Sequence, residues 1–135
     1  MAVYTNYTAA VEPLVEGINA GSDTWKIALA STVSASDTTF TPGTTDLATG
    51  NGYTQGGNTA AVSSSAQSAG TYKLVLTSPT AWTASGALSF RYVILWDSTT
   101  STPVGYWDYG STVTMASGDT FTATLDASNG VFSLT

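Results

Sequence analysis

The sequence predicts an all-β fold, an antiparallel β-sandwich of jelly-roll or Ig-like type, with one short N-terminal helix and an extended N-terminal arm. Three observations support this. Several segments alternate apolar and polar residues with a period of two, turn-forming residues cluster between them, and a single stretch has helical spacing. A chain of 135 residues has the length of one domain. We divide it into residues 1–21, the arm and helix, and residues 22–135, the sandwich.

The first 21 residues contain the arm and the helix. Residues 1–8 carry two tyrosines, Tyr4 and Tyr7, but show no helical period. From about residue 8 to residue 19 the apolar side chains fall on one helical face, at Val11, Leu14, Val15 and Ile18. Because proline is tolerated only in a first turn, Pro13 predicts a helix that is short or begins near residue 12, and Gly21 is its expected stop.

The first half of the sandwich contains three predicted strands and one long loop. In residues 24–30, Trp25, Ile27 and Leu29 share one face, which is typical of a half-buried strand. Residues 31–50 are rich in Ser, Thr, Asp, Gly and Pro and predict a loop with Phe40 as its anchor. Residues 59–65 predict a polar edge strand, and residues 72–76 predict an alternating one.

The second half contains the strongest strand of the chain, residues 88–96. Apolar residues occupy both of its faces, with Arg91 as the exception, so we expect a central strand covered on two sides. Residues 104–109 follow through a turn and predict a hairpin partner. In residues 119–126, Phe121, Ala123 and Leu125 alternate with threonines and predict an inward-facing strand. A turn at residues 129–130 then leads into a last strand over residues 131–134.

The composition excludes several classes of function. Three basic residues against nine acidic ones give a net charge of −6, which disfavours nucleic acid and acidic membrane surfaces as partners. The chain has no Cys and no His, and therefore no disulfide, no thiolate and no Ser–His–Asp triad. Serine and threonine make up 42 of the 135 residues, whereas charged residues are only 9%. A surface covered with hydroxyl groups is typical of a protein that is covered by neighbours or works outside the cell. The first residues lack the features of a signal peptide, and no apolar run has the length of a membrane span, so we expect no membrane anchor.

Two aspartates beside the aromatic hairpin are the candidates for catalysis. Asp97 and Asp108 resemble the carboxylate pair of glycoside hydrolysis, but each also has a structural explanation. Asp97 precedes three hydroxyl residues and suits a turn cap, and Asp108 can neutralise Arg91. We predict an Arg91–Asp108 ion pair, with Asp126 as the alternative partner of Arg91, and no catalytic residue. No acidic run typical of a calcium site is present, so the sequence predicts neither a metal nor a cofactor.

Aromatic side chains supply the candidate partner-binding residues. Tyr106, Trp107 and Tyr109 lie in one predicted strand, where a period of two places Trp107 and Tyr109 on the face opposite Tyr106. Most rings of the chain are expected in the core, with the remainder, Trp107 and Tyr109, in a contact surface. Stacking of a sugar on these rings is an alternative interpretation.

The arm supplies a second pair of candidates, Tyr4 and Tyr7. Termini are disordered unless they are tied down, so we expect residues 1–8 to order against a neighbouring subunit with both rings as anchors. The alternative is that the arm packs back on its own sandwich as an edge strand.

Several stretches carry a resemblance to a known group of proteins. They are Met1 to Tyr4, Ser22 to Leu29, Gly50 to Gly57, Phe90 to Asp97 and Asp126 to Val131. Together they make most of the chain resemble the small Ser/Thr-rich proteins encoded among the virion structural genes of tailed bacteriophages.

The resemblance implies a non-enzymatic part of the virion. A capsid decoration (cement) protein that binds the major capsid lattice is the first expectation, and a head–tail or fibre-associated module is compatible. Partners are then the major capsid protein or other virion proteins. Lattice geometry suggests a homo-oligomer, with a trimer as the expected form. A carbohydrate- or receptor-binding module is the alternative function, and an Asp-based hydrolase ranks last because no residue set supports it.

Overall fold

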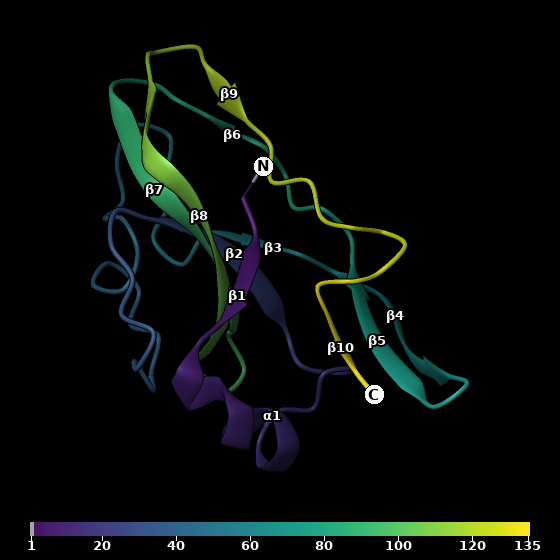
Figure 1. Cartoon of the computed structure of the whole chain (residues 1–135). Coiled ribbons are helices and arrows are strands. Elements are labelled where there is room, and N and C mark those ends of the chain that lie inside the picture. The colour runs from purple at the N-terminus through teal and green to yellow at the C-terminus, as the bar shows by residue number, and fades with distance from the viewer. Residues whose placement is uncertain (1) are drawn as a thin grey trace.

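The computed structural model describes residues 2–135 (Figure 1). Strands hold 43% of the residues and helices 7%, so the all-β prediction with one short helix is confirmed. The elements in chain order are β1 Tyr4–Asn6, a 3₁₀ turn Thr8–Ala10, α1 Val11–Glu16, β2 Trp25–Ala30, β3 Asn58–Thr59, β4 Val62–Ser68, β5 Thr71–Leu76, β6 Trp82–Thr83, β7 Leu88–Asp97, β8 Thr102–Met115, β9 Thr120–Phe121 and β10 Phe132–Leu134.

The strands form three antiparallel sheets. The largest has five strands in the order β1-β8-β7-β2-β3, a second has the order β10-β5-β4, and β6 pairs with β9. Figure 1 shows the β4–β5 hairpin projecting at one side of the molecule, with α1 below the large sheet. No helix within residues 2–135 is long and apolar enough to cross a membrane.

Strand β7 is central in its sheet and buried on both faces, as its sequence predicts. Val93 and Leu95 belong to the main core, which lies between the sheets, whereas Ile94 and Trp96 belong to a second apolar cluster on the opposite face. Phe40 covers that second face by stacking on Trp96, with ring centroids 3.9 Å apart. The long loop is therefore anchored by the predicted residue.

A buried carboxylate fastens the end of this loop. Asp46 accepts hydrogen bonds from the Tyr53 hydroxyl and from the Gly56 N–H, and the Tyr53 hydroxyl accepts one from the Leu29 N–H at 3.1 Å. Burial raises the pKa of Tyr53 above its usual range, and the bond to Asp46 adds to this. The phenol therefore stays protonated and ties the loop to β2.

The structure corrects one expectation for the C-terminal half. Only residues 120–121 of the predicted strand 119–126 join a ladder, although Ala123 and Leu125 do face the core. Alternation reports which side chains are buried, and here the Leu125 N–H finds its acceptor in the Ser78 hydroxyl instead of a neighbouring strand. Strand β10 pairs with β5, because the turn at Gly130 brings the Val131 N–H to the Leu74 carbonyl at 2.8 Å.

The helix is shorter than its apolar spacing suggests. It ends at Glu16, where the Gly17 N–H donates to the Pro13 carbonyl at 2.8 Å, and not at Gly21. No residue of α1 is buried. Helical spacing indicated which side chains share a face, but neither how far the helix extends nor how much of that face meets the core.

The arm is an edge strand of its own domain, so the expectation that Tyr4 and Tyr7 anchor a neighbouring subunit is wrong. β1 pairs with β8 and places Tyr4 opposite Trp107. The Tyr4 ring lies over Gly105, where a Cβ atom would collide with it. Tyr7 is fully buried in the second cluster, edge-on to Tyr106 at 5.5 Å. The arm therefore finds its backbone partner in the edge of β8, and both of its tyrosine rings pack within the same chain.

This placement predicts that the arm contributes to the stability of the isolated chain. Tyr7→Ala is expected to lower the free energy of unfolding by about 3–5 kcal/mol, because it empties a fully buried aromatic site. Urea unfolding followed by tryptophan fluorescence measures this. Val3→Ala is the control within the arm, since Val3 is 76% exposed, and is expected to change stability by less than about 0.5 kcal/mol. Equal effects of the two substitutions would contradict the placement of Tyr7.

Candidate interaction surfaces

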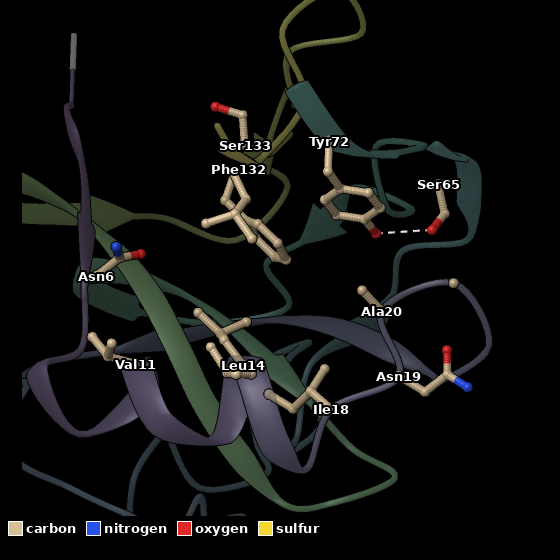
Figure 2. A pocket seen from close by; sticks show the side chains of 13 residues that line it. Asn6, Val11, Leu14, Ile18, Asn19, Ala20, Ser65, Tyr72, Phe132 and Ser133 are labelled. Carbon is tan, nitrogen blue, oxygen red and sulfur yellow. Dashed lines mark hydrogen bonds between the residues drawn. The ribbon is translucent and has the colours of Figure 1, made fainter. Parts of the chain in front are cut away.

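An apolar groove separates α1 from the outer end of the β10-β5-β4 sheet (Figure 2). Its volume is about 520 Å³. Leu14 and Ile18 line it from the helix side, and Tyr72 and Phe132 face them from β5 and β10. The β10-β5-β4 sheet thus lies apart from the large sheet at this end, and α1 fills only some of the space between them.

The groove leaves large aliphatic side chains in contact with solvent. Val11 is 60% exposed, Val15 76% and Leu134 66%, whereas Leu14 and Ile18 are partly buried against the main core. The predicted apolar face of the helix is therefore divided between the core and the groove. Exposed apolar side chains gathered around one groove are typical of an interaction site.

The rim of the groove is polar but uncharged. None of the thirteen residues that line it is charged, and the rim includes Asn6, Asn19 and Ser133. The hydroxyls of Ser65 and Tyr72 lie 2.8 Å apart in a hydrogen bond (Figure 2). An apolar centre depleted of charge with a polar border is the usual composition of a protein–protein contact.

A second cavity, of about 580 Å³, gathers three of the four predicted partner-binding residues. It lies between β1, β8 and residues 122–131, and its walls include Tyr4, Trp107 and Tyr109. Trp107 is partly buried against the main core and meets the Tyr4 ring edge-on at 5.2 Å. Tyr109 is 42% exposed. Of the aromatic candidates, Tyr109 is thus the one that remains available to a partner, while Tyr7 lies in the other cluster.

Arg91 and Asp108 meet on the surface of the large sheet. The Arg91 Nε donates to Asp108 Oδ1 at 2.8 Å and its Nη2 donates to Oδ2 at 3.1 Å. The two side chains are 39% and 37% exposed, because a bulge between Phe90 and Tyr92 turns Arg91 outward from the buried strand. The hydrogen bonds from Arg91 and from the Gly110 N–H lower the pKa of Asp108. The alternative partner, Asp126, instead accepts bonds from Ser128 and Asn129, which lower its pKa.

Asp97 and Asp108 do not form a carboxylate pair. Asp97 lies opposite Thr102 at the turn end of the β7–β8 hairpin, whereas Asp108 lies opposite Tyr92 in the middle of the ladder. Asp97 caps its turn by accepting from the Thr99 N–H at 2.9 Å. No group of three or more acidic side chains within residues 2–135 is arranged to hold a metal ion.

A carboxyl pair that the sequence did not reveal is formed by Asp97 and Asp23. Burial first, and then the neighbouring Asp23 carboxyl, raise the pKa of Asp97 to about 6. The two residues are brought together by the register of β2 and β7. Trp25 lies opposite Asp97, so Asp23, two residues before Trp25, lies at the same end of the sheet.

The raised pKa of Asp97 predicts a specific pH dependence. The folded protein keeps Asp97 protonated up to about pH 6, whereas the unfolded chain loses this proton near pH 4, so Asp97 makes stability fall as the pH rises from 4 to 6. Asp97→Asn keeps an acceptor for the turn and cannot ionise. We expect it to raise the melting temperature relative to the unsubstituted chain at pH 7.5, and to change it little at pH 4.

The control for this experiment is Asp119→Asn, which removes one acidic charge on the exposed surface. A stabilisation by Asp97→Asn that is equal at both pH values, or matched by the control at pH 7.5, would contradict the assignment.

Comparison of the chain with protein-family models, with curated proteins and with solved structures found no match.

Proposed function

We propose that this protein is a non-enzymatic structural component of a tailed-bacteriophage virion, a capsid decoration protein that binds the major capsid lattice in many copies. The observation that carries the proposal is the uncharged apolar groove between α1 and β10. Its exposed valines and leucine need a partner surface to cover them. The resemblance of the sequence to virion structural proteins supplies the kind of partner, and the proposed location is the virion.

The distribution of charge supports a passive, lattice-bound role. Only 9% of the residues are charged, and the remaining polar surface is mainly serine and threonine. Hydroxyl groups are less strongly hydrated than ions, so burying a surface that carries them against a neighbour costs less desolvation free energy.

The acidic side chains support a role without catalysis. Asp46 holds a loop, Asp97 and Asp126 cap turns, and Asp108 is paired with Arg91. Each of these carboxylates has a structural task that accounts for its position.

A second candidate function rests on a different observation. Tyr109 is 42% exposed beside a cavity that Thr122 and Thr124 also line. An exposed ring beside hydroxyl groups suits a neutral sugar, which favours a carbohydrate- or receptor-binding module on a fibre or head–tail structure as the alternative. Copy number separates the two functions. Densitometry of purified particles against the capsid band is expected to give hundreds of copies for decoration, whereas a fibre component gives at most dozens.

The groove can be tested by substitution of Val15, the most exposed of its large apolar residues. Val15→Asp is expected to weaken binding to particles that lack the protein by about tenfold or more, equivalent to ~1.4 kcal/mol, because a carboxylate must then be desolvated at the contact. Cosedimentation of purified chain with such particles measures this.

The matched control is Thr112→Asp, which adds the same charge at an exposed position on β8 outside the groove. Both variants are expected to keep the unsubstituted melting temperature within about 2 °C, since surface changes cost little. Equal binding by Val15→Asp and Thr112→Asp would contradict the role of the groove.

A further inference from the structure

Strand β4 presents a long, unprotected sheet edge. It is the outer strand of the β10-β5-β4 sheet, and six of its seven residues are exposed. It contains neither a charged residue nor a proline, the usual devices that keep an edge from pairing. The outer strands of the other sheets have only two or three residues. The stretch of β8 beyond β1 is interrupted by Gly110 at φ +80°.

The turn at the end of β4 shows which backbone groups point outward. Ala69 and Gly70 both have positive φ, 51° and 82°, and form a two-residue hairpin turn. In such a hairpin the pair next to the turn is hydrogen-bonded and the pairs then alternate. Ser65 and Gln67 therefore direct their N–H and C=O groups away from β5. No loop or side chain within residues 2–135 supplies partners for them.

We propose that two copies of this chain pair through β4, antiparallel about a two-fold axis at Ala66. This register lets Ser65 of one copy exchange backbone hydrogen bonds with Gln67 of the other, and it places Ser64 opposite Ser68. Ala66 faces its own symmetry mate in a non-bonded pair, where Cα atoms approach to about 4.5 Å. Addition of a strand to a free edge satisfies backbone groups that otherwise bind only water.

A second copy is the occupant that the chemistry of β4 selects. The incoming strand must be extended, small in its side chains and free of charge, and β4 itself has these properties. The chain has a net charge of −6, so contact between two copies is favoured where neither contributes an acidic residue. A two-fold contact also gives a closed dimer and not an open filament, because the β4 edge of each copy is covered by the β4 edge of the other. The inference does not depend on the proposed virion function.

Cysteine cross-linking tests the register. The chain contains no Cys, so one introduced thiol has only its counterpart in another copy as a protein partner. With oxidised glutathione as the oxidant, two thiols become one disulfide and glutathione is reduced. Ala66→Cys is expected to form a disulfide-linked dimer on a non-reducing gel, because a Cα separation of about 4.5 Å permits the bond.

Ser68→Cys is the control in the same exposed strand. In the proposed register position 68 lies four residues from its own symmetry mate, about 13 Å along the strand, which is too far for a disulfide. Cross-linking of Ala66→Cys is expected to be at least about tenfold faster. Equal rates for the two variants would overturn the proposal.

A second pair of variants tests the backbone. Gln67→Pro removes the outward N–H, whereas Gln67→Ala keeps it, and neither change removes a ladder bond to β5. In sedimentation experiments the unsubstituted chain and Gln67→Ala are expected to be dimers and Gln67→Pro a monomer with an unchanged circular dichroism spectrum. A monomeric or trimeric unsubstituted chain would contradict the proposal. The cysteine comparison decides the question if the proline variant does not fold.

Discussion

The two-sided burial of strand β7 is the constraint on which the rest of the fold depends. A strand with apolar residues on both faces needs a cover on each, and the chain supplies two different ones. The smaller sheets cover the face with Val93 and Leu95, while the long loop and the arm cover the face with Ile94 and Trp96. Loop and arm are therefore parts of the core structure, although the loop has no regular secondary structure.

The need to cover Ile94 and Trp96 explains why the long loop is ordered although it has no regular secondary structure. Phe40 is held by stacking on Trp96, and the Trp96 Nε1 donates to the Gly56 carbonyl at 3.0 Å. Asp46 then joins Tyr53 and Gly56 by hydrogen bonds. A hydroxyl-rich chain with few ion pairs thus orders a long loop through one aromatic stack and one buried carboxylate.

The parts of this fold that were predictable are those in which side-chain spacing alone carries the information. The period of two located β2, and the run of apolar residues on both faces predicted β7 and its central position. The β7–β8 hairpin was predictable from the short turn between its strands. The partner of β10 was not, because Val131 reaches Leu74 through a turn whose direction the spacing does not record. The arm illustrates the same limit, since two tyrosines before a helix have the same pattern whether they pack on their own domain or on a neighbour.

The candidate sites divide in a similar way. The Arg91–Asp108 contact was predictable from charge, because Arg91 is the only cation in its strand, but its exposed position results from a bulge. The groove was not predictable, since Val11, Leu14, Val15 and Ile18 form one apolar face in the sequence and only the structure divides it. The Asp23–Asp97 pair required the β2–β7 register.

We propose that the groove between α1 and β10 is the surface that this protein applies to a capsid lattice. Electron cryomicroscopy of purified particles tests it most directly. If the groove is the contact, density for the chain is expected on the outer capsid surface, with Val11, Val15 and Leu134 covered by the capsid subunit and Tyr109 away from it. A bound chain whose groove faces solvent, or density confined to a fibre or the head–tail junction, would contradict it.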